Sequence, residues 1–258
     1  MESKVVVITG ASGGIGAALA VKLGAEGHSL VLAARREKEL KAVAEKAGLR
    51  AIAVVTDVTK RKDVERLRDA ALKKFGHVDV WVNNAGRGIG KNVMELTDED
   101  LDEMIRVNVK SVIYGMQAIV PHFQQRGKGH LINVSSFLGR VPMAAFRSAY
   151  NAAKSAVNAL TANLRMDLRK DYPGIHVSLV MPGVVSTNFA RNVLGNAQPP
   201  AAGIPARSPM VIQSAEEVAG LIAGLIEKPA PELYTNPASH EMAQRYYRDV
   251  GAYEAEGR

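Results

Sequence analysis

The sequence contains no cysteine, and no apolar run in it approaches the roughly 20 residues that a membrane-spanning helix needs. The first absence excludes disulfide bonds and thiolate metal sites, and it permits a reducing compartment. The N-terminal segment MESKVVVITG enters a strand-like run at once, without the pattern of a signal peptide. We therefore expect a cytoplasmic protein with no membrane partner and no resident metal ion.

Aromatic residues are also scarce, at 5% of the chain, and they do not alternate with basic residues. The formal net charge of +7 comes from dispersed groups such as Arg35-Arg36, residues 60–62 and Lys73-Lys74. A nucleic-acid surface would gather such cations on one face or stripe. The pattern indicates a solvated basic surface, so we expect no nucleic-acid partner.

Short β-branched runs alternate with longer helix-patterned segments along most of the chain. The first run, KVVVI, is apolar throughout, as in a parallel strand buried on both faces. The predicted strands span residues 4–8, 29–33, 51–55, 78–83, 130–135, 175–181 and 232–235. The predicted helices span residues 14–27, 37–47, 60–75, 98–125, 149–170 and 215–227. Repeated units of this kind predict an α/β fold, with a doubly wound parallel sheet and helices on both faces in a three-layer sandwich.

Two segments after Pro182 depart from this alternation. Residues 188–214 hold several Gly and Pro residues and little periodicity. Long loops in compact domains are commonly functional, so we predict a substrate lid there, with a surface insertion as the alternative. The tail, residues 238–258, is polar with aromatic residues and is expected to pack as a helix over 240–253. We expect residues 1–258 to form one domain.

The first predicted strand runs into TGASGGIG at residues 9–16, which opens the first predicted helix. Glycines there let the turn adopt conformations closed to other residues and let the backbone approach a pyrophosphate. The N-terminus of the helix adds unpaired N–H groups and a partial positive charge. A tight loop is the ordinary alternative, but the strand before and the helix after favour a dinucleotide site. The residues expected to bind the cofactor here are Gly10, Ser12, Gly14, Ile15 and Gly16.

The second predicted strand ends in Arg35-Arg36, where an NAD-preferring site would place a carboxylate against the ribose. Arginine at this place can grip a 2′-phosphate through paired, charge-assisted hydrogen bonds. The alternative is that the two arginines only begin a charged helix. We predict NADP(H) as the cofactor. Asp57, after the third strand, is expected either to contact the adenine or to cap the helix starting near residue 60.

Tyr150 and Lys154 stand four residues apart in a predicted helix, so their side chains share one face. A nearby ammonium stabilises a phenolate, and we expect Lys154 to lower the pKa of Tyr150 toward neutrality. The same spacing is common on exposed helices. The pair gains meaning from Ser135-Ser136, which end the preceding strand at the edge where α/β sheets bind ligands.

With these motifs in order, the chain resembles the short-chain dehydrogenase/reductase family from Val5 to about Thr187. The glycine turn is similar to the family's cofactor loop, and the resemblance implies a Rossmann-like fold. It further assigns cofactor contacts to Asp57, Val58, Asn84, Ala85, Gly86, Pro182, Gly183 and Thr187, and a catalytic tetrad to Asn108, Ser136, Tyr150 and Lys154.

The resemblance implies a role for each tetrad residue. Ser136 would bind the substrate oxygen and Tyr150 would exchange its proton. Lys154 would tune Tyr150 and hold the nicotinamide ribose, and Asn108 would keep a water in a relay through Lys154. The interval from Ser136 to Tyr150 is one residue longer than is usual in the family, which leaves Ser135 as the alternative serine. A small insertion at residues 140–147 would absorb the difference.

The expected function is hydride transfer between NADP(H) and a carbonyl or secondary alcohol substrate. Alternatives are an epimerase or dehydratase, which the short chain disfavours, and a non-catalytic NADP(H)-binding regulatory protein, which an intact tetrad disfavours. Hydrolysis by a serine is disfavoured because neither serine lies in a G-x-S-x-G elbow. Family members pair through the helices matching 98–125 and 149–170, so a homodimer or homotetramer is expected. A partly apolar substrate pocket is expected from Phe146, Phe189, Val193, Leu194 and Met210.

Overall fold

The computed structural model describes residues 2–187, 194 and 210–256. Its centre is a parallel sheet of seven strands in the order β3-β2-β1-β4-β5-β6-β9. These strands are β1 (Val5–Thr9), β2 (Ser29–Ala34), β3 (Ala51–Val55), β4 (Val80–Asn83), β5 (Gly129–Val134), β6 (Ile175–Met181) and β9 (Glu232–Tyr234). The predicted strands are thereby confirmed to within two residues at each end. A separate short ladder pairs β7 (Val185–Ser186) with β8 (Gln213–Ser214), which the sequence did not predict.

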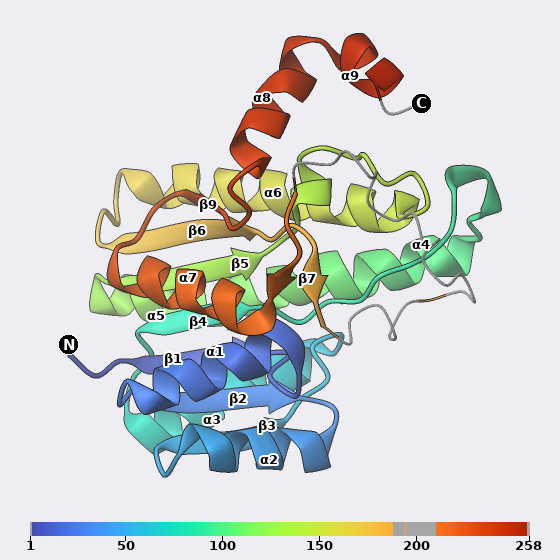
Figure 1. The fold of residues 1–258 in the computed structure, drawn as a ribbon. Coiled ribbons are helices and arrows are strands. Elements are labelled where there is room, and N and C mark those ends of the chain that lie inside the picture. The colour runs from blue at the N-terminus through green and yellow to red at the C-terminus, as the bar shows by residue number, and fades with distance from the viewer. Residues whose placement is uncertain (1, 188–193, 195–209, 257–258) are drawn as a thin grey trace.

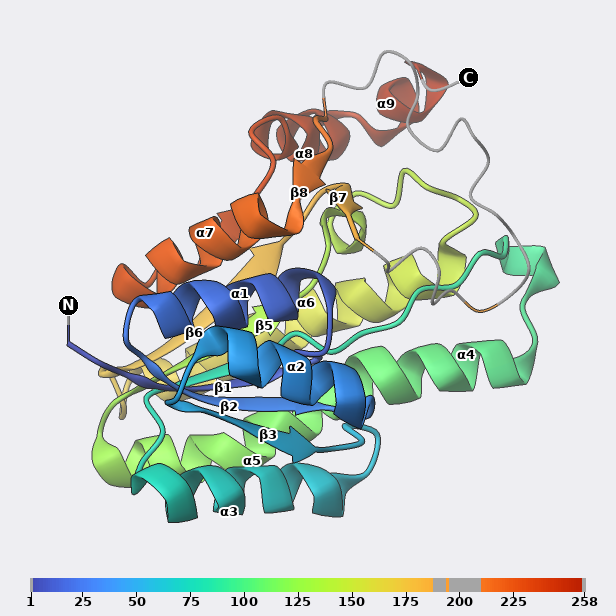
Figure 2. The ribbon, with the colours of Figure 1, turned by 60° about the horizontal axis from the view of Figure 1, so that its bottom comes forward.

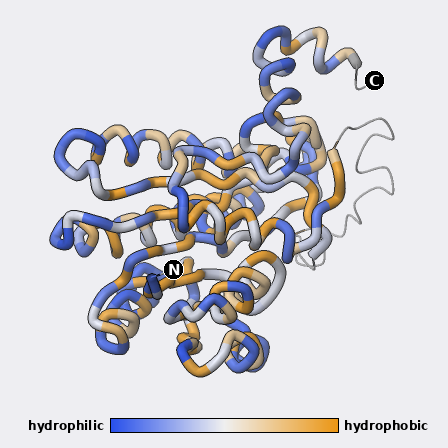
Figure 3. The backbone as a smooth tube through the Cα atoms, turned by 60° about the vertical axis from the view of Figure 1, so that its left-hand side comes forward, coloured by the Kyte–Doolittle hydropathy of each residue, from blue (hydrophilic) through white to orange (hydrophobic). Residues whose placement is uncertain are grey.

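Helices cover both faces of the sheet, so the predicted three-layer, doubly wound architecture is confirmed (Figures 1 and 2). One face carries α1 (Gly14–Ala25), α2 (Glu37–Ala47) and α7 (Ala215–Glu227), and the other carries α3 (Arg61–Phe75), α5 (Ser111–Arg126) and α6 (Ser148–Arg169). Alternate residues of β1 serve the two layers: Val6 and Ile8 pack with the first set, and Val5 and Val7 with the second. Figure 3 shows the hydrophobic strands running between helices of mixed polarity.

The helix expected over residues 98–125 is interrupted. The chain forms α4 (Asp98–Ile105), then a π-helical turn (Arg106–Lys110), then α5. A π-helical turn holds an extra residue per turn, and such turns are frequent at functional sites. The uninterrupted α-helix predicted from periodicity is therefore wrong at this point, and the extra residue lies beside Asn108, which is fully buried.

The C-terminal tail forms two helices, α8 (Ser239–Arg248) and α9 (Val250–Glu256), where one was expected. They break at Asp249, whose backbone is extended. Both project beyond the sandwich at the end where the strands finish (Figures 1 and 2). The base of α8 is fixed by Met242, which packs in a small apolar cluster with Phe137, Val141 and Met210. Residues 257–258 lie outside the described part of the chain.

The strand order reverses between β1 and β4. The chain winds outward from β1 through β2 to β3, then returns to place β4 on the other side of β1 and winds outward again. The loops at the carboxyl ends of β1 and β4 therefore separate in opposite directions. In open α/β sheets this is where ligands bind.

Candidate active site

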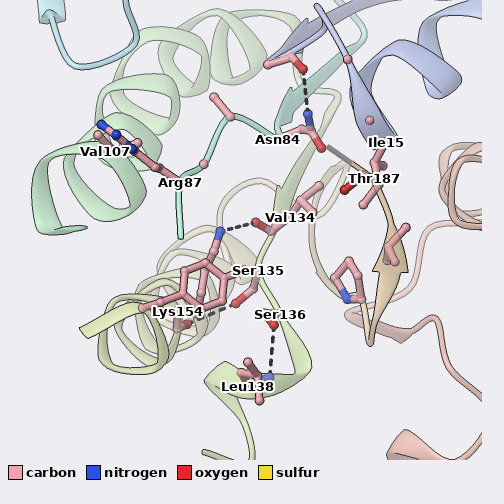
Figure 4. Close-up of a pocket in the computed structure, with 18 of the residues that line it drawn as sticks. Ile15, Asn84, Arg87, Val107, Val134, Ser135, Ser136, Leu138, Lys154 and Thr187 are labelled. Carbon is pink, nitrogen blue, oxygen red and sulfur yellow. Dashed lines mark hydrogen bonds between the residues drawn. The ribbon is translucent and has the colours of Figure 1, made fainter. Parts of the chain in front are cut away.

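A cavity of about 1310 Å³ opens at the carboxyl ends of the strands, where loops after β1 through β6 meet (Figure 4). Most of the residues predicted for the site line it. These are Gly10, Ser12, Gly14, Ile15, Arg35, Arg36, Asp57, Val58, Asn84, Ala85, Gly86, Ser136, Tyr150, Lys154, Pro182, Gly183 and Thr187. Gly16 and Asn108 do not reach its wall, although both were predicted as site residues.

The glycine turn fits under the loop after β4. Gly10 and Gly14 have φ of 70° and 56°, in the left-handed region that favours glycine. A Cβ on Gly10 would come within 2.8 Å of Ala85 Cα, and one on Gly16 within 2.6 Å of the Asn84 amide nitrogen. Gly16 thus serves close packing of α1 beneath the turn. The backbone at the N-terminus of α1 stays exposed to the cavity, as an anion cradle requires.

Hydrogen bonds fasten these two loops together at the reversal point of the sheet. Asn84 Nδ2 donates to Thr9 O (2.9 Å), and Thr9 Oγ1 accepts from the backbone nitrogens of Asn84 (3.0 Å) and Ala85 (3.1 Å). Asn84 therefore lines the cavity while its amide nitrogen bonds within the protein (Figure 4). Through these hydrogen bonds, Asn84 holds the glycine turn in place.

The arginines after β2 flank the glycine turn. Arg36 donates to Ser12 Oγ from Nη2 (3.1 Å) and Nε (3.3 Å), and it lies 3.9 Å from a carboxylate oxygen of Glu39. Arg35 and Glu39 also line the cavity. Two guanidinium groups and one carboxylate thus line this part of the cavity, where a ribose would lie. Glu39 was not predicted from the sequence, because it lies inside α2 rather than at the end of the strand.

Asp57 caps its own turn rather than a helix. Its Oδ1 accepts from the backbone nitrogen (3.1 Å) and hydroxyl (2.8 Å) of Thr59, whereas the residue preceding α3 is Lys60. Burial opposes ionisation, but the two Thr59 hydrogen bonds and the charge of Arg35 outweigh it and hold the pKa of Asp57 below its ordinary value. The alternative of a cap on α3 is therefore wrong.

The two serines after β5 point to different partners. Ser135 Oγ donates to Asn158 Oδ1 (2.6 Å) and lies 3.2 Å from Lys154 O, so its hydroxyl is bound to α6. Ser136 lies next to Tyr150, close enough to oppose the rise in the pKa of that tyrosine, and its Oγ accepts from Leu138 N (3.2 Å). Ser136 is thus the serine beside the tyrosine, and residues 140–147 form the loop between a short 3₁₀ turn (Phe137–Gly139) and α6.

Lys154 does not lower the pKa of Tyr150 in this arrangement. Burial raises the pKa of Tyr150, while the hydrogen bond with Ser136 and the charge of Arg147 act in the opposite direction without cancelling it. Lys154 Nζ lies 5.7 Å from the tyrosine ring centroid and donates to Val134 O (3.0 Å). The expected lowering is therefore wrong here, because burial dominates and the ammonium faces the strand end. Burial also lowers the pKa of Lys154 itself, to about 8.

Asn108 is placed by the π-helical turn. Its Nδ2 donates to Arg87 O (2.9 Å) and Met104 O (3.2 Å), and its Oδ1 accepts from Arg87 N (3.1 Å). A Cβ on Gly86 would lie 3.0 Å from Asn108 Oδ1 and 3.5 Å from Lys154 Nζ. Asn108 and Lys154 therefore approach Gly86 from the same region, with Asn108 behind the wall that Gly86 and Arg87 form.

The segment after β6 forms the opposite wall of the cavity. Phe137 N donates to Pro182 O (2.8 Å), which ties this segment to the serine loop. Thr187 faces the glycine turn, 3.5 Å from where a Cβ on Gly14 would lie. Of the residues predicted for a substrate pocket, Phe146 and Met210 line the cavity, Leu194 pairs with Ile89, and Phe189 and Val193 lie outside the described residues, as does most of the predicted lid 188–214.

Two further cations line the cavity beside Tyr150, and sequence reasoning missed them. Arg87 directly follows Gly86, and Arg147 precedes Tyr150 by three residues, close to one helical turn. That spacing is the signal by which Arg147 was open to prediction. Among residues 2–187, 194 and 210–256 there is no cluster of three potential metal ligands, and no helix is both long and apolar enough to cross a membrane.

Comparison with known proteins agrees with this geometry. Residues 4–197 match the short chain dehydrogenase family. An uncharacterized oxidoreductase of Staphylococcus epidermidis is 36% identical over 187 residues, covering 72% of this chain and 80% of that protein. The uncharacterized oxidoreductase YxnA of Bacillus subtilis is 34% identical over 247 residues, covering 94% of this chain and 68% of that protein.

Solved structures share the whole fold. A short chain dehydrogenase/reductase of Burkholderia phymatum in complex with NAD is 31% identical, with a TM-score of 0.85 over 97% of this chain and 95% of that one. A 3-ketoacyl-(acyl-carrier-protein) reductase of Brucella melitensis complexed with NADH is 28% identical, with a TM-score of 0.83 over 92% and 98%. An alcohol dehydrogenase of Thermococcus sibiricus complexed with 5-hydroxy-NADP is 29% identical, with a TM-score of 0.78 over 92% and 98%. Two of these neighbours are thus in complex with NAD or NADH, and one with an NADP derivative.

Proposed function

This chain belongs to the short-chain dehydrogenase family of oxidoreductases, and we propose that it transfers a hydride between NADP(H) and a carbonyl or secondary alcohol substrate. The observation that carries the proposal is the placement of Ser136 next to Tyr150 on the wall of the cavity, with Lys154 on the same helix face as the tyrosine.

The residues present fit a dinucleotide. The N-terminus of α1 and the glycine turn would hold the pyrophosphate, Arg35 and Arg36 the adenosine end, and Lys154 the nicotinamide ribose. When bound, the nicotinamide supplies or accepts the hydride. The segment Pro182, Gly183 and Thr187 would bound the site on its far side, and Val58, Ala85 and Gly86 would line the cofactor's path.

Within this site Ser136 would orient the substrate oxygen and Tyr150 would move the proton. Reduction of a carbonyl needs the protonated phenol, and burial keeps Tyr150 protonated at neutral pH. Oxidation of an alcohol needs the phenolate, which burial disfavours. Lys154, whose pKa is about 8, is mostly protonated at pH 7, so its positive charge is present in the site at neutral pH. We therefore propose that the free enzyme at pH 7 is in the protonation state that reduction of a carbonyl needs. Asn108 would act by fixing the backbone of Arg87 and by holding a water in the relay to Lys154.

A panel of ketones, aldehydes and quinones with NADPH and NADH tests the activity. We expect NADPH oxidation with at least one carbonyl compound. Tyr150→Phe should abolish turnover and leave cofactor binding nearly intact, whereas Tyr172→Phe, which removes a hydroxyl outside the cavity, should not change turnover. Binding of NADPH without turnover of any substrate would instead favour the alternative, a non-catalytic NADP(H)-binding regulatory protein.

The preference for NADP(H) is proposed from the charges after β2. Arg35→Ala and Arg36→Ala should weaken NADPH much more than NADH, because only NADPH carries the 2′-phosphate that guanidinium groups grip. Glu39 is the group that would oppose this preference, so Glu39→Gln should strengthen NADPH binding. Equal losses for both dinucleotides in the arginine variants would reject the assignment.

We also propose a cytoplasmic homodimer or homotetramer that acts on a small molecule, without nucleic-acid or membrane partners. Pairing would use the exposed faces of α5 and α6, where Met166 is 65% exposed. Sedimentation velocity of the wild type and of Met166→Glu tests this assembly. A charge placed at Met166 on the pairing face should dissociate the assembly, and a monomeric wild type would overturn the proposal.

A further inference from the structure

We infer that the substrate carries a carboxylate, which Arg147 binds while the reacting carbonyl lies at Tyr150. This inference rests on the proposed function, because it names the class of carbonyl compound that the same cavity takes. Its support comes from the position of Arg147, from the contacts that fix its side chain, from the lack of an acidic partner among the described residues, and from the distribution of charged residues along the cavity.

Arg147 and Tyr150 lie on the same side of the start of α6. Arg147 is the residue that precedes the helix, and a spacing of three residues brings side chains together on a helix surface. Both residues line the cavity. Their charges also influence each other: burial raises the pKa of Tyr150 and the guanidinium opposes that rise, while burial lowers the pKa of Arg147 and Tyr150 opposes that fall. A ligand bound at the phenol therefore lies close to the guanidinium.

The arginine is held in place. Its Nη1 donates to Ile89 O (3.2 Å), and its guanidinium lies 5.3 Å from the centroid of the Phe146 ring. Its backbone bridges to Lys91, and Ser148 Oγ donates to Lys91 O (2.7 Å). A fixed guanidinium loses little conformational freedom when it binds an anion, so its position favours ligand recognition over solvation.

The charge of Arg147 is not neutralised by an acid in the described part of the chain, where no carboxylate lies within ion-pair distance of it. Three other partly buried arginines pair with an acid: Arg87 with Glu103, Arg126 with Asp79, and Arg140 with Glu232. Arg165 lacks an acid but donates to two backbone carbonyls and does not line the cavity. A buried charge without a partner costs free energy, which a bound anion would offset.

The charges along the cavity are sorted by position. The described carboxylates that line it are Glu39 and Asp57, which follow β2 and β3 at one side of the sheet. Beside Tyr150, on the side of β4 and β5, the charged lining residues in the described part of the chain are Arg87, Arg147 and Lys154. With Arg87 paired to Glu103 and Lys154 assigned to the cofactor, the positive charge of Arg147 is left over among these described residues. One charge matches a monoanion, which favours a carboxylate over a phosphate.

Matched substrates test the inference. Oxo acids with the carbonyl at C2, C3, C4 or C5 are compared with their methyl esters and with the corresponding oxoalkyl phosphates, under NADPH. We expect at least one oxo acid to exceed its ester in kcat/KM. In Arg147→Gln that acid should lose roughly tenfold or more, mostly in KM, while its ester changes little. Arg147→Lys should restore part of the loss, and Arg66→Gln, which removes an exposed charge on α3, should change neither.

The outcomes separate this inference from the proposed function. Turnover of esters and neutral ketones without any preference for acids would overturn the carboxylate while leaving the hydride transfer intact. Equal losses for acid and ester in Arg147→Gln would also overturn it, since the arginine would then act only through Tyr150. A preference for the phosphates would replace the carboxylate by a dianion. Absence of turnover with every carbonyl compound would count against the proposed function itself.

Discussion

Lys154 Nζ donates a 3.0 Å hydrogen bond to the carbonyl oxygen of Val134, so the buried ammonium is fixed to the end of β5. No carboxylate lies within ion-pair distance of it in the described part of the chain. Burial disfavours the charged form of Lys154 and lowers its pKa to about 8, so keeping the ammonium charged at neutral pH costs free energy. The cost is expected where a charge serves chemistry rather than stability.

Lys154→Met should stabilise the protein while abolishing turnover. In wild type the folded state binds the lysine proton less tightly than the unfolded state, whose pKa is 10.5, so the buried charge lowers stability most below pH 8. Methionine removes that penalty and loses one hydrogen bond, for a net gain of about 2 kcal/mol at pH 7 in urea unfolding. By pH 10 the gain should nearly vanish, because the wild-type amine is then neutral in the folded state. A gain that does not depend on pH would contradict this account.

The two serines should separate stability from catalysis. Ser136→Ala removes the hydroxyl beside Tyr150, so kcat should fall by about 10²–10³-fold, and the lost hydrogen bond from Leu138 N should lower the free energy of unfolding by only about 0.5–1 kcal/mol. Ser135→Ala leaves Asn158 without its 2.6 Å partner, so it should lower stability by about 1–2 kcal/mol and spare most of kcat. Steady-state kinetics and urea unfolding of both variants measure the difference. The reverse pattern would assign the substrate oxygen to Ser135.

His130 should make the fold sensitive to acid. Burial lowers its pKa to about 3, and its ring lies between Ser178, at 2.8 Å, and His176. Because the folded pKa is below the unfolded value of 6.5, the neutral ring stabilises the fold above pH 6.5, and this stability is lost as pH falls toward 3. At pH 5 the loss is about 2 kcal/mol. The unfolding free energy of His130→Gln should therefore fall less steeply between pH 6.5 and 4.5 than that of wild type, and equal slopes would reject the assignment.

Two glycines in helices should respond to alanine with opposite signs. A Cβ on Gly115, in α5, would overlap Asn83 Oδ1, which accepts a 2.8 Å hydrogen bond from the fully buried Trp81. Gly115→Ala should therefore destabilise the protein by about 2–4 kcal/mol. Gly220, in α7, has open space where its Cβ would lie, so Gly220→Ala should stabilise by about 0.5–1 kcal/mol. Chemical denaturation of the pair isolates the steric effect from helix propensity.

The apolar runs were sufficient to predict the strands of the sheet, because a strand buried on both faces needs apolar residues at successive positions. Gly10 and Tyr150 were found from the sequence for a similar reason: each belongs to a motif whose parts are adjacent along the chain. The π-helical turn at 106–110 was missed because one extra residue hardly changes an apolar period. The short ladder β7–β8 was missed because two residues carry no period at all.

The pKa shifts and the charge pairing in the site were harder to predict than the identity of the residues that line it. Spacing shows that Lys154 and Tyr150 share a helix face, but the direction of the tyrosine pKa depends on how deeply the phenol is buried and on where the ammonium points. The unpaired charge of Arg147 depends on the absence of an acid among residues distant in sequence. Both properties belong to the packed chain, so a sequence pattern does not contain them.

Because of the π-helical turn, α4 and α5 follow one another without a break, but the side chains of α5 are rotated about the helix axis relative to those of α4. A regular helix advances about 100° per residue, so the extra residue rotates α5 relative to α4 by about that angle. Deleting one residue from 106–110 would restore a single α-helix and turn the α4 side chains, together with Asn108, away from Arg87. The packing of α5 against the sheet and the position of Asn108 beside Arg87 would then no longer be set independently, and the protein could keep its core only by giving up the alignment of its site.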